Sequence, residues 1–343
     1  MKKIKIAQIG FTHEHAGGKI NSLEKMSDIY EIAGVVNDLG INPPPEYLTD
    51  VDAPFRKYKM LSLDEVLADP EIQAVTVEVP NNELVPVAIK CAEKGKAMHM
   101  DKPAGVDLDL YKKLLDICKE KKLPFQMGFM FRGNPAFQFC IKAIRQKWIG
   151  EVISIEADMN HAYGGEAYQK YISRFSGGLM FNLGCHLVDF VAAAMGRPEK
   201  VTGFLRSAPG DPENIKNNCL AVLEYHNAFA IINSCSRQKN CTQSRLIRIV
   251  GTNGTIIFSP IERFDGESVV IEMDLMEDMG YPAGKHNISF PVQSDRYAGQ
   301  LSELARVIRG EQESVYPFEH DLLVHEITLA ASGYIDWKNN GGE

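Results

Sequence analysis

The chain has 343 residues, a length that suits two domains rather than one. Its 45% hydrophobic and 24% charged residues are typical of a globular protein, and its formal net charge of −8 argues against a nucleic-acid partner. The seven cysteines form no CxxC pair and lack zinc-site spacing, so we expect reduced thiols in a cytoplasmic protein. The first apolar run ends at Gly10, too early for a signal peptide, and no run reaches membrane-spanning length.

Residues 1–123 alternate short apolar runs with amphipathic stretches. Strands are expected over 4–9, 32–36, 74–79 and 97–100, and helices over 15–26, 64–68, 84–94 and 107–121. Ser62 is positioned to cap the helix that begins at 64. Alternation of this kind predicts an α/β domain with a parallel sheet and right-handed crossovers.

The pattern changes near Leu123, where we place the boundary between a first domain (1–123) and a second (124–343). Short turns such as 252–254 separate apolar runs in the second domain, which indicates hairpins and a mainly antiparallel sheet. The strands expected there are 152–158, 201–207, 219–225, 229–236, 246–250, 255–259 and 269–273, and the helices expected are 179–195, 297–309 and 318–337. The last two helices can pack back on the first domain.

The turn after the first strand is a candidate dinucleotide site, because such turns bring backbone N–H groups and a helix N-terminus to a pyrophosphate. Gly10 fits the first glycine of the pattern G-x-G-x-x-G, whereas Thr12 and His15 occupy the second and third positions. The candidate contacts are Gly10, Phe11, Thr12, His13 and His15. His13 and His15 also form an H-x-H pair, but no further ligand cluster is evident nearby, so we expect no metal.

Two more strand ends belong to this candidate site. Asp38 ends the second strand, where a carboxylate can bind ribose hydroxyls and repel a 2′-phosphate, which favours NAD over NADP; Asn37 is the competing position. Val79, Pro80 and Asn81 follow another strand and are expected to border the nicotinamide ribose. Ordinary solvated turns, with Asn81 as a helix cap, are the alternative at both places.

The segment Asp101-Lys102-Pro103 follows the strand at 97–100. Proline fixes its own φ and restricts the residue before it, so the backbone of Lys102 has little freedom. One ammonium group can thereby be aimed at a bound substrate. Lysine–proline pairs are also common in solvated turns, so this segment indicates a substrate site only in combination with the patterns around it.

A polar stripe lies in the helix expected over 179–195. On a regular helix Asn182, His186 and Asp189 share one face at i, i+4 and i+7, amid apolar neighbours. A histidine can accept a hydroxyl proton near neutral pH, and a carboxylate can orient it. His186 considered alone is better explained as a buried or capping histidine; with Lys102 available, we favour a catalytic role.

These residues resemble the Gfo/Idh/MocA oxidoreductases, the group that contains inositol dehydrogenases and glucose–fructose oxidoreductase. The resemblance runs through most of the chain and is carried by the first strand and turn, 63–70, Val79-Pro80-Asn81, Lys94-Gly95-Lys96, Asp101-Lys102-Pro103, Gly128-Phe129, Arg132, Asn134-Pro135, Gly177-Gly178, His186 and Asp189. It implies a Rossmann dinucleotide-binding domain followed by an α/β domain with a large open sheet, which often forms a homodimer or homotetramer interface.

The resemblance also implies hydride transfer between a ring carbon of a sugar or cyclic polyol and nicotinamide. Lys102 then contacts the reacting hydroxyl and also borders the cofactor with Asp101, while His186 is the general acid/base and Asp189 can orient it. Relatives commonly carry Asp where this chain has Asn182; since asparagine cannot take a proton, Asn182 is expected to bind a substrate hydroxyl instead. Further substrate contacts are suggested at Arg132, Asn160, His161 and Tyr163.

Two other functions stay open at this stage. One is redox-neutral cleavage of a glycoside, in which bound NAD oxidises the sugar transiently and the hydride is returned; Asn182 slightly favours it. The other is a non-catalytic sugar or nucleotide sensor on the same fold. Retention of both Lys102 and His186 argues for an enzyme.

Overall fold

The computed structural model describes residues 2–40, 44–162, 165–263 and 265–338, and the chain forms two compact units. The first unit combines Met1–Gly133 with Tyr297–Leu322, and the second combines Asn134–Arg296 with Leu323–Glu343. The first unit therefore extends beyond the boundary placed at Leu123, because a sixth strand joins its sheet after that residue.

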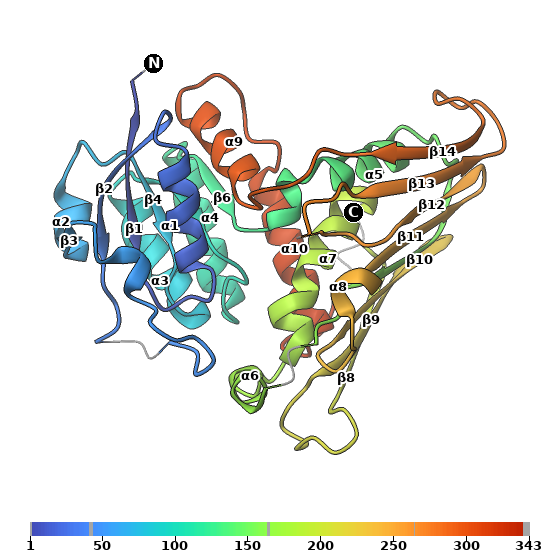
Figure 1. The fold of residues 1–343 in the computed structure, drawn as a ribbon, viewed down its shortest axis with the longest axis horizontal. Coiled ribbons are helices and arrows are strands. Elements are labelled where there is room, and N and C mark those ends of the chain that lie inside the picture. Colours follow the sequence, from blue (N-terminus) through green and yellow to red (C-terminus); the bar gives the residue numbers. More distant parts are fainter. Residues whose placement is uncertain (1, 41–43, 163–164, 264, 339–343) are drawn as a thin grey trace. The chain divides into compact units, whose positions relative to one another are not determined.

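A parallel sheet of six strands forms the centre of the first unit, in the order β3-β2-β1-β4-β5-β6 (Figure 1). The strands are β1 Ile4–Ile9, β2 Tyr30–Val36, β3 Met60–Leu61, β4 Ala74–Val77, β5 Ala97–Met100 and β6 Phe125–Met127. The strand order reverses between β1 and β4, and ligands of doubly wound folds bind at the carboxyl ends of strands at such a switch point. The predicted α/β fold class is confirmed.

The helices of the first unit are α1 Ala16–Lys25, η1 Ala53–Phe55, α2 Leu63–Ala68, α3 Asn81–Glu93, α4 Leu108–Glu120, η2 Met130–Gly133 and α9 Ala298–Ile308. Ser62 caps α2 as predicted: its hydroxyl accepts from the Glu65 backbone N–H, and the Glu65 carboxylate accepts from the Ser62 backbone N–H. Helix α9 returns to this unit late in the chain, where the hydroxyl of Tyr30 donates to the carbonyl of Leu301 at 2.7 Å.

The second unit contains a sheet of eight strands in the order β14-β13-β12-β11-β7-β10-β9-β8. The strands are β7 Val152–Asp158, β8 Lys200–Arg206, β9 Asn218–Tyr225, β10 Ala228–Cys235, β11 Leu246–Gly251, β12 Gly254–Phe258, β13 Val270–Leu275 and β14 Gly284–Ser289. Neighbouring strands run antiparallel except β7 and β10. The mainly antiparallel sheet predicted from the hairpin turns is thus confirmed.

The remaining helical segments are α5 Pro135–Arg145, α6 Glu166–Ile172, the π-helix η3 Met180–Gly184, α7 Cys185–Met195, α8 Cys241–Ser244 and α10 Phe318–Ala331. Helix α7 packs on β7 and β10. Side chains of β10 alternate accordingly: Ala230 and Ile232 are buried on the helix side, whereas Phe229 is exposed on the other face. None of the described helices is both long enough and apolar enough to cross a lipid bilayer.

Several elements differ from the sequence expectations. Strands β3 and β6 have only two and three residues and are too short to show a periodic apolar pattern. The edge strand β14 is polar and shows no apolar pattern either. The helix expected over 318–337 ends at Ala331. The helix expected over 179–195 is not regular, because it begins with the π-helix η3 before α7.

Gly10 supports the turn between β1 and α1, and its replacement tests that turn. Its φ is +100°, and a Cβ there would lie 2.5 Å from the Glu78 carbonyl oxygen. We expect Gly10→Ala to lower the free energy of unfolding by about 2–4 kcal/mol, from left-handed strain plus overpacking. Gly95→Ala is the matched control, since Gly95 has φ +72° and open space around its Cβ position.

The control should lose only about 1 kcal/mol, the cost of the left-handed conformation alone. Denaturant unfolding of both variants gives the comparison. Equal losses for the two variants would contradict the close packing of the turn against Glu78.

Candidate functional site

The turn between β1 and α1 is fixed by backbone hydrogen bonds to both neighbouring strands. The N–H of Gly10 donates to the Val36 carbonyl at 3.0 Å, and the N–H of His13 donates to the Glu78 carbonyl at 3.1 Å. Helix α1 then begins with His15 as its N-cap residue, without a side-chain cap. The turn therefore lies at the carboxyl end of the sheet, between β2 and β4.

Asp38 closes this turn from the β2 side. Its carboxylate accepts the Phe11 backbone N–H at 2.7 Å and the Thr12 hydroxyl, and the residue is 5% exposed. Asn37 is exposed, and its side-chain oxygen accepts the Leu39 N–H at 2.9 Å. Of the two competing positions, Asp38 is the one that contacts the turn.

Asn81 fixes the backbone beneath Lys102. Its side-chain amide donates to the carbonyls of Lys102 at 3.0 Å and Pro103 at 3.3 Å, while the Lys102 N–H donates to the Asp101 carboxylate at 2.7 Å. The Lys102 side chain is 1% exposed, and its Nζ lies 4.0 Å from the Glu14 carboxylate. The limited backbone freedom expected before Pro103 is thus reinforced by side-chain hydrogen bonds.

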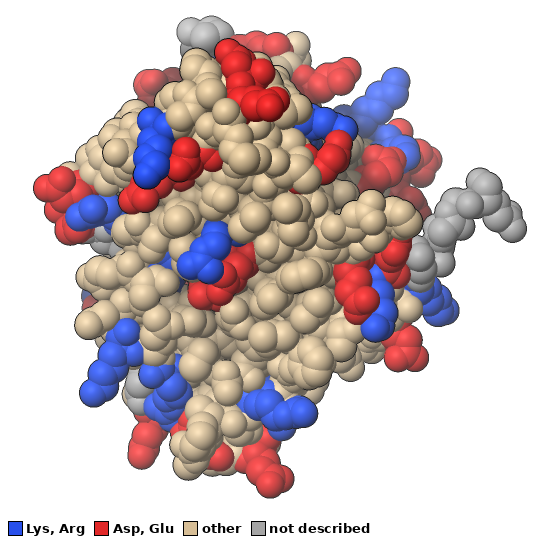
Figure 2. Space-filling model, turned by 90° about the vertical axis from the view of Figure 1, so that its right-hand side faces the viewer, with Lys and Arg blue, Asp and Glu red and all other residues tan. Residues whose placement is uncertain are grey.

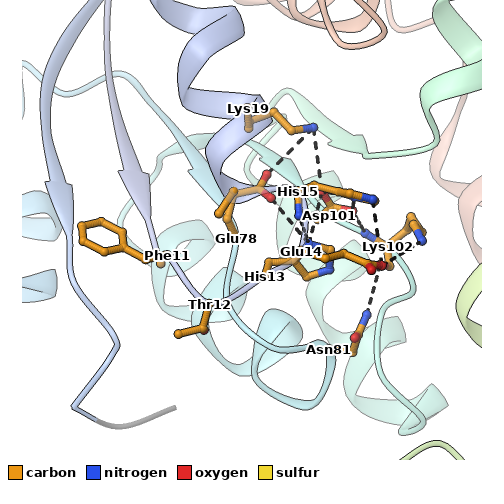
Figure 3. A network of polar contacts seen from close by, with 12 residues as sticks. Phe11, Thr12, His13, Glu14, His15, Lys19, Glu78, Asn81, Asp101 and Lys102 are labelled. Carbon is orange, nitrogen blue, oxygen red and sulfur yellow. Dashed lines mark hydrogen bonds and ion pairs between the residues drawn. The ribbon is translucent and has the colours of Figure 1, made fainter. Parts of the chain in front are cut away.

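Charged and polar side chains of the turn, of helix α1 and of the ends of β4 and β5 lie together in a group that we call the buried ionic cluster (Figure 3). Its members are His13, His15, Lys19, Glu78 and Asp101. His15 Nδ1 is 3.1 Å from both carboxylate oxygens of Asp101. His13 Nδ1 lies 3.7 Å from Asp101 and 3.8 Å from Glu78. The Lys19 ammonium is 3.9 Å from each carboxylate. Charges buried this deeply are stable only with such partners.

Lys19 also has two partners outside the cluster. Its Nζ lies 2.5 Å from His99 Nε2 and 4.1 Å from the centre of the Tyr297 ring. Burial, aided by the Lys19 charge, lowers the pKa of His99 to about 3, so His99 is neutral and its Nε2 accepts a hydrogen bond from the Lys19 ammonium. The other ring nitrogen of His99 then donates to Gln126 Oε1 at 2.8 Å. Both ring nitrogens of His99 are thus engaged within this unit.

The two carboxylates of the cluster have opposite pKa shifts. Burial and the neighbouring Asp101 charge raise the pKa of Glu78 well above its usual range. Burial also acts to raise the pKa of Asp101, but His15, His13 and Lys19 outweigh it and hold that pKa well below its usual range. Asp101 is therefore the carboxylate that stays ionised, and the two groups act as one coupled pair.

Lys19 and Glu78 were not predicted as site residues, although both leave a signal in the sequence. Glu78 follows directly on the apolar run of β4, where both faces of a central parallel strand are buried. Lys19 lies on the same side of α1 as the buried residues Ala16 and Leu23. A charged side chain at such a position needs a buried partner, and each residue supplies one for the other.

The second unit contains the polar stripe predicted around His186. Asn182, His186 and Asp189 are each 2% exposed, so all three are buried in this unit. Asn182 lies in the π-helix η3, whereas His186 and Asp189 lie in α7. The regular i, i+4 alignment of Asn182 with His186 was therefore wrong, because a π-helical turn contains more residues than an α-helical one. π-Helical turns are frequent at functional sites.

The suggested substrate contacts lie in different surroundings. Arg132 donates to Asp321 at 2.7 Å and stacks on Tyr316, with both ends of the ion pair 1% exposed, which favours a structural role. Asn160 accepts the Cys235 N–H at 2.7 Å, and His161 lies 2.8 Å from the Arg245 guanidinium. Tyr163 lies outside the described residues.

The residues at the turn fit a dinucleotide, with two departures. Gly10 permits the close turn, and the Asp38 carboxylate has acceptor capacity beyond its two donors. Thr12 and His15 stand where the pattern has glycines, and the Thr12 side chain is turned onto Asp38 rather than outward. The fold and this turn together define a nucleotide-binding α/β protein.

The chain belongs to the Gfo/Idh/MocA family. The family's model for the NAD-binding Rossmann fold matches residues 11–129, and that for its C-terminal domain matches residues 137–257. Levoglucosan dehydrogenase of Pseudarthrobacter phenanthrenivorans is 21% identical over 244 residues, covering 63% of this chain and 62% of its own. The chain matches between about two fifths and three fifths of the length of such curated relatives.

Solved structures share the fold over nearly the whole chain. A levoglucosan dehydrogenase complexed with NADH and levoglucosan has a TM-score of 0.78 at 16% identity, with 97% of this chain and 98% of that chain covered. An oxidoreductase of Desulfitobacterium hafniense, described as NADPH-dependent, has a TM-score of 0.77 at 20% identity, with 98% and 96% covered. The family model describes an NAD-binding fold; of these two neighbours, one is a complex with NADH and the other is described as NADPH-dependent.

Lys19→Met tests the electrostatic account of the cluster. Removing the ammonium deletes the buried cation that lies 3.9 Å from both Glu78 and Asp101, so we expect a loss of about 3 kcal/mol or more in the free energy of unfolding. Lys57→Met is the matched control, because Lys57 pairs with Glu24 on the surface, where both side chains are about half exposed.

The control should leave stability almost unchanged, since exposed ion pairs contribute little. Denaturant unfolding measures both variants. A Lys19→Met protein as stable as the wild type would contradict the role assigned to this ammonium.

Proposed function

We propose that this chain is an NAD-dependent oxidoreductase that transfers a hydride between nicotinamide and a ring carbon of a cyclic polyol, sugar or sugar derivative. The observation that carries the proposal is the buried Lys102, held by Asn81 and Asp101 at a strand end beside the dinucleotide turn. The family assignment and the levoglucosan dehydrogenase relative support the substrate class.

In this proposal Lys102 stabilises negative charge that develops on the reacting oxygen, where a fixed cation in a dry site is most effective. His186 takes up or returns the hydroxyl proton, and Asp189 orients His186. Asn182 binds a substrate hydroxyl, because an amide donates and accepts hydrogen bonds but does not titrate. Nicotinamide, when bound, supplies the acceptor or donor of the hydride.

Asp38 supports NAD rather than NADP as the cofactor. Its carboxylate ends β2 beside the turn and already accepts two hydrogen bonds from Phe11 and Thr12, so it is fixed in place. A fixed negative charge there attracts ribose hydroxyls and repels a 2′-phosphate.

Turnover across a panel of inositols, sugars, sugar acids and glycosides tests the activity, with NADH and carbohydrate products followed in the same samples. We expect NADH to accumulate with one substrate class. His186→Ala should lower kcat by about 10²–10⁴-fold while NAD binding is retained, because a general acid/base contributes that much. His226→Ala, at a histidine with 85% side-chain exposure, should leave turnover unchanged.

Cleaved carbohydrate without accumulated NADH would move the protein to the redox-neutral class. Binding of NAD and sugar without turnover, in the wild type as in His186→Ala, would contradict the enzyme assignment and favour a sensor.

We further propose that the open face of the second unit's sheet joins copies of this chain into a dimer or tetramer. Phe204, Phe229 and Val270 are exposed large apolar side chains on β8, β10 and β13. Pairing places Ile231 opposite Val222 and Phe204 opposite Leu220, which adds half-buried apolar side chains to the same face. Figure 2 shows a broad uncharged area on this side, with a few charged side chains near its centre. Large apolar patches on a surface mark interaction sites.

Sedimentation of Phe229→Glu tests this surface. A charge buried in an apolar interface is costly, so the variant should shift from oligomer to monomer at micromolar concentration. Val315→Glu, at an exposed apolar residue of the first unit, should sediment like the wild type. A wild-type chain that is monomeric at the same concentration would contradict the proposal.

A further inference from the structure

We infer that the buried ionic cluster is a binding site for one divalent transition-metal ion, held by His13, His15 and Asp101 with Glu78 beside them. The inference goes beyond the proposed hydride transfer, and it concerns the turn whose glycine pattern is interrupted. One nitrogen from each histidine and one oxygen of Asp101 lie within 4.8 Å of one another. This ligand set was not evident in the sequence, because Asp101 is 86 residues from His15.

The distances suit an ion. Donors that each lie about 2.1 Å from a metal are about 3.0–3.4 Å apart when they are neighbours in a tetrahedral or octahedral shell. His15 Nδ1 and Asp101 are 3.1 Å apart, and His13 Nδ1 and Asp101 are 3.7 Å apart. Small side-chain rotations would therefore complete the set. Figure 3 shows the two imidazoles, Asp101 and Glu78 directed toward one another.

His13 provides a second observation that supports a cation site. Its Nδ1 accepts the His15 backbone N–H at 3.2 Å, so this nitrogen carries a lone pair. The same nitrogen lies 3.7 and 3.8 Å from the carboxylates of Asp101 and Glu78. An unprotonated imidazole nitrogen that lies this close to two carboxyl groups is the kind of donor that a metal ion binds, and the ion would replace the His15 N–H at this lone pair.

Glu78 points to the same place. It is fully buried, and neither of its carboxylate oxygens takes part in a hydrogen bond with the residues that the structure describes. Lys19 lies 3.9 Å from both Glu78 and Asp101, but its close contact is His99 at 2.5 Å. Lys19 is thus engaged by His99, and an ion bound here would give the Glu78 carboxyl oxygens the close partner that the described side chains do not provide.

The donor set indicates the class of metal. Two imidazole nitrogens with carboxylate oxygens favour Zn²⁺, Co²⁺, Mn²⁺ or Fe²⁺ over Mg²⁺ and Ca²⁺, which prefer oxygen alone. His15 is the partly exposed member, with 17% of its side chain accessible, and gives the ion a route from solvent. The bound ion would tie the β1–α1 turn to the end of β5.

Titration of the chelator-treated protein with Co²⁺, followed by visible absorption and calorimetry, tests the site without cofactor or substrate. We expect one Co²⁺ per chain, no thiolate-to-cobalt charge-transfer band, and displacement by Zn²⁺ but not by Mg²⁺. His13→Ala and His15→Ala should each weaken binding at least about tenfold. His226→Ala, at an exposed histidine, should bind like the wild type.

Thermal unfolding of each variant without metal shows whether it is folded, and partly exposed His15 is the position least expected to disturb the core. Wild-type protein that takes up no Co²⁺ in large excess would overturn the inference. So would Co²⁺ binding that both folded variants retain at full affinity, since the ion would then lie elsewhere. Neither result depends on whether the chain oxidises sugars.

Discussion

The buried carboxylate of Asp101 is the constraint on which the first unit's functional edge depends. It accepts the Lys102 N–H at 2.7 Å, lies 3.1 Å from His15 Nδ1 and 3.9 Å from the Lys19 ammonium. One side chain thereby connects the end of β5, the β1–α1 turn and the first helix. Ionic contacts at full burial are strong only when every partner is present, so this part of the fold is specified cooperatively.

This arrangement also changes how the dinucleotide turn is built. A glycine-rich turn relies on small residues that let its backbone approach a pyrophosphate. In this chain Thr12 is turned onto Asp38, and His15 is drawn toward Asp101. The turn is therefore shaped by side-chain contacts on both sides, and only Gly10 keeps the role that its position in the pattern predicts.

The sequence predicted the parallel and antiparallel sheets, since β1, β5 and β7 carry clear apolar runs between turns. It did not predict the π-helix at Asn182, because the backbone pattern of one widened turn leaves no periodic signal. The partnership of Glu78 with Lys19 and Asp101 was also missed, because it joins three elements that only the sheet order brings together. Local spacing identifies single residues, whereas a buried charge cluster follows from topology.

We propose that this altered turn still holds NAD, with Asp38 selecting it over NADP. Calorimetric titration of the purified chain with NADH and with NADPH tests the claim most directly. We predict that NADH binds more tightly than NADPH, and that Asp38→Ala removes most of the difference because the repelling carboxylate is lost. Tighter binding of NADPH, or no binding of either nucleotide, would contradict the account.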